Sequence, residues 1–177
     1  MDPEIADPLE DEGHGTAVAG IIGAVSNNGI GISGVCWKAN IMALRADRLS
    51  NGGLVSCFEY AVADGARIIN CSWGEAEVVS SVFKQAFERL RELGVLCVFS
   101  AGNRVEDADE TPRYPVAWGL DNFFVVTSTL PNDTRVPRAT YGARRVHIAA
   151  PGYYILTTGL REERPYVYWM GTSFAAP

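Results

Sequence analysis

The sequence lacks a basic stripe and lacks any long apolar run. It has 15 Lys and Arg residues against 21 Asp and Glu residues, for a net charge of −6. Without a cluster of positive charge, binding to a nucleic-acid backbone is not expected. No apolar stretch approaches the roughly 20 residues that a membrane-spanning helix needs. The first ten residues, "MDPEIADPLE", are too acidic for a signal peptide.

Two kinds of motif are also absent. The four cysteines, Cys36, Cys57, Cys71 and Cys97, show no C-x-x-C spacing. We expect small, buried free thiols, although the spacing also allows disulfides. No G-x-G-x-x-G or G-x-x-x-x-G-K-[ST] loop follows a strand-like run, which argues against a nucleotide-binding domain.

What the sequence does contain is an alternation of helical and strand-like segments. The chain has 177 residues, 47% of them hydrophobic, enough for one globular domain with a core of its own. Helices are expected at 14–25, 54–66 and 77–94, the last with Val78, Val82, Phe83, Phe87 and Leu90 along one side and Gly94 as its C-cap. Apolar strands are expected at 39–46, 67–73, 95–103, 123–130, 145–152 and 153–158.

Strands that are apolar throughout and alternate with helices indicate a parallel sheet covered on both faces. The predicted class is therefore α/β: a doubly wound, three-layer sandwich around a mostly parallel sheet. In such sheets the functional residues gather beyond the carboxyl ends of the strands.

Four short motifs could carry chemistry. His14 lies in "GHGTAVAG", where the flanking glycines leave room for a substrate near an imidazole suited to general-base work. Asn103 ends the run "SAGN" and could aim an amide donor at an oxyanion. Ser173 in "GTSFAAP" has small neighbours, which permit a tight turn that exposes a nucleophile. The segment "NCSWG" at 70–74 could pair with an extended peptide.

Taken in this order, "HGTAVAG", "SAGN" and "GTSFAAP" resemble the subtilisin-like serine proteases, or subtilases. The resemblance runs from about residue 11 to the last residue and includes "NNGIGISGV", "INCSWG", "RYPVAW", "ATYG" and "IAAPG". It implies a serine endopeptidase in which Ser173 attacks the scissile carbonyl and His14 accepts its proton. Asn103, with the backbone N–H of Ser173, would hold the oxyanion.

The same resemblance implies the remaining contacts. Polypeptide substrates would pair with Ser72, Trp73 and Gly74, and the P1 pocket would be bordered by Ser100, Ala101, Gly102, Tyr114 and Pro115. No cofactor is required, but calcium as a structural ion is conceivable, with Asn28 as a side-chain ligand. By analogy with the family, the parent protein would be secreted or surface-associated and carry a propeptide.

One part of the family's machinery has no clear counterpart. Subtilases carry a triad aspartate at the end of an apolar strand before the histidine. Asp2, Asp7 and Asp11 are the candidates here, and none follows such a strand. Residues 1–12 resemble instead the acidic loop before the histidine motif. We therefore expect a partial peptidase domain, lacking the first strand and the helix after Ser173, that shows little proteolysis alone. The alternative is a noncatalytic pseudoprotease that keeps only the peptide-binding edge.

Overall fold

A four-stranded parallel sheet forms the centre of the molecule. The computed structural model describes residues 13–46, 50–73 and 80–177. The strands are β1 (Ile68–Cys71), β2 (Leu96–Ser100), β3 (Phe123–Thr129) and β4 (Ile148–Pro151). They pair in the order β1-β2-β3-β4, and every pairing is parallel. The predicted α/β class with a parallel sheet is confirmed.

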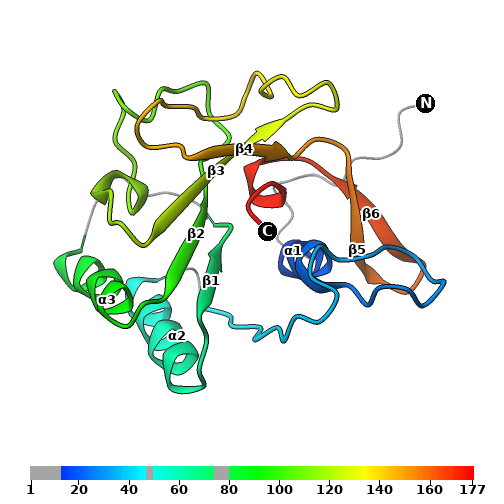
Figure 1. Ribbon diagram of the computed structural model, residues 1–177, viewed down its shortest axis with the longest axis horizontal. Helices are drawn as coiled ribbons and strands as arrows, with labels where there is room; N and C mark the ends of the chain where they lie inside the picture. Colours follow the sequence, from blue (N-terminus) through cyan, green and yellow to red (C-terminus); the bar gives the residue numbers. More distant parts are fainter. Residues whose placement is uncertain (1–12, 47–49, 74–79) are drawn as a thin grey trace.

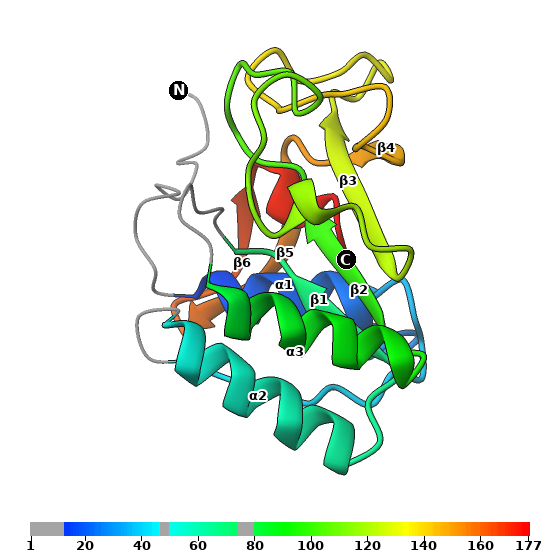
Figure 2. The same ribbon diagram turned by 90° about the vertical axis from the view of Figure 1, so that its left-hand side faces the viewer.

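Helices lie on both sides of this sheet. The helices α2 (Asn51–Ala63) and α3 (Ser81–Glu92) cover one face, and α1 (His14–Gly23) lies on the other side (Figures 1 and 2). Ser50 and Ser80 cap α2 and α3, because each hydroxyl accepts a hydrogen bond from a backbone N–H three residues on. None of the described helices is long and apolar enough to cross a membrane.

An aromatic core fills the space between the sheet and the two helices α2 and α3. Phe87 is fully buried, and its ring lies 5.0 Å from Phe58, 5.6 Å from Phe99 and 5.2 Å from Phe123, measured between ring centroids. Rings at these separations pack favourably beyond the area they bury. We call the four-stranded sheet with α2 and α3 the sheet region.

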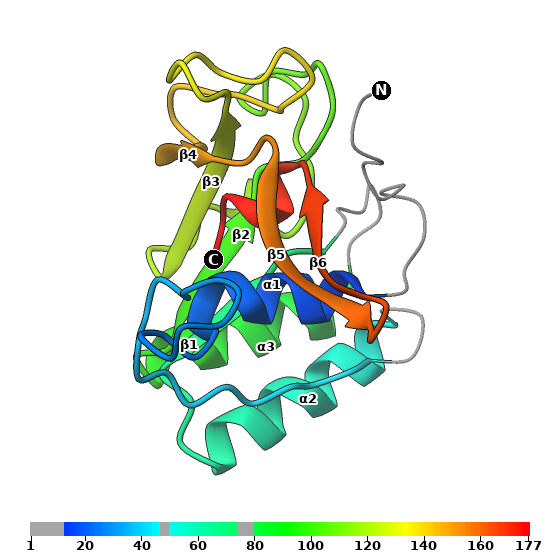
Figure 3. The ribbon, with the colours of Figure 1, turned by 90° about the vertical axis from the view of Figure 1, so that its right-hand side faces the viewer.

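A second, smaller unit stands beside the sheet. The strands β5 (Ile155–Arg161) and β6 (Arg164–Trp169) form an antiparallel hairpin that packs on α1 (Figure 3). Its small core combines Ala17 and Val18 of α1 with Trp169 and Phe174, and the partly buried side chains of Ile21, Ile22, Ile155 and Val167 pack against it. We call α1 with this hairpin the hairpin region.

The prediction missed β6, although "RPYVYW" is rich in the aromatic and β-branched residues typical of strands. The expected strand at 39–46 is wrong: these residues form no helix or strand. Ile41 and Leu44 are 44% and 41% exposed there, and no described strand pairs with this segment. Val82 was placed on the apolar side of α3 and is instead 62% exposed. Val78 lies outside the described residues.

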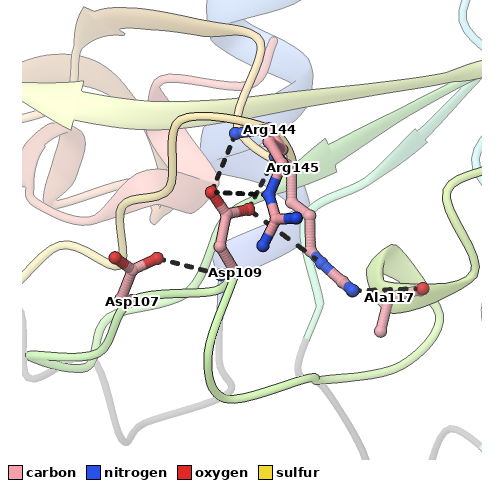
Figure 4. A network of polar contacts seen from close by, with 5 residues as sticks. All are labelled: Asp107, Asp109, Ala117, Arg144 and Arg145. Carbon is pink, nitrogen blue, oxygen red and sulfur yellow. Dashed lines mark hydrogen bonds and ion pairs between the residues drawn. The ribbon is translucent and has the colours of Figure 1, made fainter.

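Asp109 links two long loops above the sheet through hydrogen bonds (Figure 4). Its carboxylate accepts hydrogen bonds from the backbone N–H groups of Arg144 and Arg145, at 2.9 and 3.1 Å. Arg145 in turn donates to the carbonyl of Ala117 at 3.2 Å. Burial raises the pKa of Asp109, but these N–H donors and the charge of Arg144 outweigh that effect and lower the pKa overall. These interactions of Asp109 connect the β2–β3 loop to the β3–β4 loop.

Candidate active site

Ser173 lies in a single turn of 3₁₀ helix, η3 (Thr172–Phe174), which follows directly after the hairpin. Gly171, before this turn, has φ of 134°, a conformation that side chains other than glycine rarely adopt. A Cβ at this position would also lie 3.2 Å from the Asn103 amide nitrogen. Glycine is therefore required here both by the backbone conformation and by the close approach of Asn103.

Asn103 is tied to the turn that carries Ser173. It follows β2, and its Oδ1 accepts hydrogen bonds from the backbone N–H of Thr172 at 2.9 Å and from the Thr172 hydroxyl at 3.2 Å. The same hydroxyl oxygen accepts a hydrogen bond from the Gly102 N–H at 3.1 Å. With Oδ1 engaged by two donors, the orientation of the amide is fixed, and its Nδ2 side is left to donate elsewhere.

His14 begins α1 and lies against the same turn. Its ring centroid is 5.2 Å from that of Phe174, the residue after Ser173, and 5.9 Å from that of Trp169. Gly13, which precedes it, has φ of 100° and serves as the N-cap. The structure thus brings His14, Asn103 and the Ser173 turn together, although they are far apart in the sequence.

Ser72, just beyond β1, makes a second connection to the nucleophile turn. Its hydroxyl donates to the Ser173 carbonyl at 2.8 Å, and Asn70 Nδ2 donates to the Ser72 hydroxyl at 2.9 Å. The Ser173 hydroxyl lies 3.5 Å from the Ser72 carbonyl, which is a weak contact. The carboxyl end of β1 therefore holds the backbone of the Ser173 turn in place.

The predicted substrate-binding residues lie near the carboxyl ends of the strands. Trp73 packs on Phe83 and Phe99 at 6.2 and 6.0 Å between ring centroids, so its ring belongs to the aromatic core. Ser100 and Ala101 are buried at the end of β2, and Gly102 follows with φ of 108°. Gly74 lies outside the described residues.

Tyr114 and Pro115 are joined by a cis peptide bond and lie in the β2–β3 loop. The Tyr114 ring is 5.5 Å from that of Trp118, and Val116 is buried in the same hydrophobic cluster as Ala101. This loop therefore packs on the same core as the end of β2, and its role in a P1 pocket stays a prediction.

Sequence reasoning missed the residues that hold the candidate site together. Thr172 was read only as a small neighbour of Ser173, yet it is fully buried and fixes Asn103. The sequence did offer a clue, because Thr172 stands directly before Ser173 and carries a hydroxyl that can form hydrogen bonds. Trp169 and Phe174 beside His14 gave no signal, since aromatic residues in apolar segments are usually core.

The cysteines supply no competing nucleophile at this site. All four are free thiols, and Cys71 and Cys97 are fully buried as predicted, whereas Cys36 is exposed. Burial raises the pKa of Cys97 to about 12 and raises the pKa of Cys71 as well. A thiol with a raised pKa carries little of the reactive thiolate at neutral pH.

Asn28, the predicted calcium ligand, lies in an exposed loop. Its Oδ1 accepts a hydrogen bond from the Ile30 N–H at 3.0 Å, which closes a local turn. Across the described ranges, no group of three or more His, Cys, Asp or Glu side chains could hold a metal ion. Because calcium also takes backbone carbonyl and amide oxygens, its binding near Asn28 stays a prediction of the family resemblance.

The carboxylate that would orient His14 is not located. Asp2, Asp7 and Asp11 all lie outside the described residues. The geometry therefore assembles a candidate nucleophile, an imidazole and an amide donor at one end of a parallel sheet.

Comparison with known proteins identifies the family of the chain. The model of the subtilase family matches residues 2–177. Thermitase from Thermoactinomyces vulgaris is 37% identical over 96% of this chain, which spans 59% of thermitase. Subtilisin-like protease 2 of Plasmodium falciparum is 33% identical over 98% of this chain, which spans 13% of that protein.

Solved structures show the same fold. A protease from Pseudoalteromonas arctica matches with a TM-score of 0.80 and 27% identity, over 93% of this chain and 55% of that one. A cold-adapted subtilisin-like serine proteinase matches with a TM-score of 0.76 and 26% identity, over 94% of this chain and 57% of that one. The chain belongs to the subtilase family.

Proposed function

We propose that the protein is a serine endopeptidase in which Ser173 is the nucleophile and His14 the general base. The observation that carries the proposal is the fixed orientation of Asn103. Thr172, the residue directly before Ser173, donates two hydrogen bonds to Asn103 Oδ1 and so holds the amide in place. An oxyanion donor must be preorganised in this way to stabilise the tetrahedral intermediate more than the substrate.

The proposed reaction begins at Ser173. The Ser173 hydroxyl adds to the scissile carbonyl while His14 accepts its proton. The carbonyl oxygen becomes an oxyanion, which Asn103 Nδ2 and the Ser173 N–H stabilise. His14 then gives the proton to the leaving amine, which departs and leaves an acyl-enzyme. Water attacks the acyl group while His14 accepts a proton from it, and His14 returns that proton to Ser173 as the product acid is released.

A polypeptide substrate fits the strand ends next to this site. Ser72 and Trp73 follow β1. Ser100 ends β2, its parallel neighbour, and Ala101 and Gly102 follow. An extended peptide could form backbone hydrogen bonds with segments of this kind. Calcium binding and export remain predictions from the family resemblance.

A fluorophosphonate probe tests the proposal, because it forms a covalent adduct only with an activated serine. We expect one adduct per chain, located on Ser173 by mass spectrometry. Labelling should be lost in Ser173→Ala and strongly slowed in His14→Gln, but unchanged in Ser81→Ala, which alters an exposed serine of α3. Slow labelling is expected if an orienting carboxylate is absent, because such a group contributes about 10⁴-fold to the rate.

The alternative function, a pseudoprotease that binds peptides without cleaving them, gives a different result. The purified chain would then bind an extended peptide in a titration but form no fluorophosphonate adduct, even after prolonged incubation. That outcome would overturn the proposed catalytic role of Ser173.

A further inference from the structure

The hairpin β5–β6 is connected to the candidate active site in two places. After β6 ends at Trp169, only Met170 and Gly171 precede the η3 turn that contains Ser173. β5 packs along α1, the helix that begins with His14. Figure 3 shows the hairpin in front of α1, with η3 just above the helix. Both groups of the proposed catalytic pair are therefore attached to the same two-stranded ribbon.

Two adjacent threonines make the connection between β5 and α1. The Thr157 hydroxyl donates to the Ala17 carbonyl at 2.6 Å, and the Thr158 hydroxyl donates to the Thr16 carbonyl at 2.7 Å. Thr157 is fully buried. The two accepting carbonyls belong to consecutive residues in the first turn of α1, two and three positions after His14.

The packing around these bonds leaves little freedom. A Cβ at Gly20, one turn further along α1, would collide with Thr158 Oγ1 and lie 2.7 Å from Thr157 Oγ1. Only a glycine allows the hydroxyls to approach the helix this closely. Two hydrogen bonds to consecutive carbonyls resist both sliding of the helix along β5 and rotation about its own axis.

We infer that Thr157 and Thr158 are positioning residues that set where His14 lies relative to Ser173. The inference rests on the proposed function, but it concerns residues that take no part in the proposed reaction itself. Without the hydroxyls, α1 would keep its apolar packing and lose its fixed register. A displacement of about 1 Å in a catalytic group can cost roughly 100-fold in rate.

Replacement by valine tests the role of the hydroxyls, because valine keeps nearly the same shape. In the Thr157→Val/Thr158→Val chain, we expect the maximal rate of fluorophosphonate labelling at Ser173 to fall at least about tenfold. The probe concentration that gives half of that rate should stay the same, because the probe's binding surface is unchanged. Thr157→Ser/Thr158→Ser keeps both hydroxyls and should label within about twofold of the unmodified chain.

A control separates positioning from loss of stability. Ser80→Ala removes the N-cap of α3 in the sheet region and costs stability of about the size expected for one lost hydrogen bond. It should leave the labelling rate unchanged. If Ser80→Ala slows labelling as much as the valine pair does, or if the valine pair labels at the normal rate, the inference is wrong.

A second measurement does not require a reactive serine. The ring of Trp169 shifts the NMR signals of nearby protons, and His14 lies 5.9 Å from Trp169 between ring centroids. The difference between the His14 ring-proton signals of the folded and the unfolded chain should be clear in the unmodified chain and much smaller in the valine pair. An unchanged signal would overturn the inference, whereas failure of labelling in the unmodified chain would overturn only the proposed function.

Discussion

The sheet region and the hairpin region are held together by different kinds of interaction. The sheet region depends on a large aromatic core centred on Phe87, with α2 and α3 covering one face of four parallel strands. The hairpin region has a small core, and threonine hydroxyls and glycine contacts fix its helix to β5. Hydrophobic packing is non-directional, whereas hydrogen bonds define a register.

This difference indicates a division of roles. The sheet region supplies most of the buried apolar area and carries Asn103 and the residues expected to bind substrate. The hairpin region contributes less buried area but carries His14 and leads into Ser173. We therefore expect changes in the sheet region to affect stability first, and changes in the hairpin region to affect reactivity first.

The largest effect is expected from Phe87→Ala. Phe87 is fully buried at the centre of the aromatic core, and truncation of such a residue costs about 3–5 kcal/mol of unfolding free energy. Urea unfolding followed by circular dichroism measures the loss. Phe124→Ala serves as the control: this residue is 38% exposed on the other face of β3, and we expect its loss to cost far less. Equal losses would contradict the assignment of the core.

A smaller effect on stability, with a clear effect on reactivity, is expected from Gly20→Ala. Alanine favours a helix over glycine by about 1 kcal/mol. The new methyl group would nevertheless displace Thr157 and Thr158, at a cost of about 1–3 kcal/mol for overpacking. Labelling of Ser173 should fall about tenfold, as for the valine pair.

Gly52→Ala is the matched control for this helix substitution. Gly52 lies in the first turn of α2, and a Cβ there meets no other atom within 4 Å. We expect unchanged labelling and a gain of stability of up to about 1 kcal/mol. If Gly20→Ala also leaves labelling unchanged and raises stability, then the close packing at Gly20 does not fix the positions of Thr157 and Thr158.

A pH-dependent effect is expected from Asp109→Asn. The pKa of Asp109 is lowered in the folded chain, so the unfolded chain takes up the proton at higher pH. The resulting stabilisation is present above the ordinary pKa of about 3.9 and is lost as the pH falls through the folded value. The difference in unfolding free energy between the unmodified chain and Asp109→Asn should therefore be largest near neutral pH and shrink below about pH 4. A difference that stays constant from pH 7 down to pH 3 would contradict this role of Asp109.

The smallest perturbation is thiol modification of the native chain. Cys36 is exposed and should react first with a disulfide reagent, whereas Cys71 and Cys97 are buried in the sheet core with raised pKa values. Cys71 and Cys97 should react only in denaturant. The absorbance of the thiolate released from the reagent measures both rates. Rapid reaction of Cys97 in the native chain would contradict the close packing of the sheet region.

The sequence predicted the parts of the fold that depend on strong local patterns. Continuous apolar runs located β1 to β4, and the amphipathic pattern with Phe83, Phe87 and Leu90 located α3. The expected strand at 39–46 failed because an apolar run becomes a strand only where another strand pairs with it. β6 was missed because the charged residues of "LREERP" interrupted the apolar pattern at the tip of the hairpin.

For the candidate site, the motifs identified His14, Asn103 and Ser173 but not what holds them in place. The roles of Thr172, Thr157 and Thr158 depend on contacts across the fold, between positions 69, 140 and 142 residues apart in the sequence. Threonine is common in strands, so its presence in β5 gave no indication of a bond to α1. Local patterns cannot reveal such long-range pairs.

The bond between Thr157 and Ala17 has a consequence for how the protein is made. Because it joins positions 140 residues apart, the helix with His14 leaves the ribosome long before the strand that fixes it. Domains dominated by such distant pairings fold slowly, since a long loop must close before the contact forms. If His14 and Ser173 act together as proposed, the nascent chain carries the imidazole before its partner serine has been made, and the pair can form only after synthesis has passed Ser173.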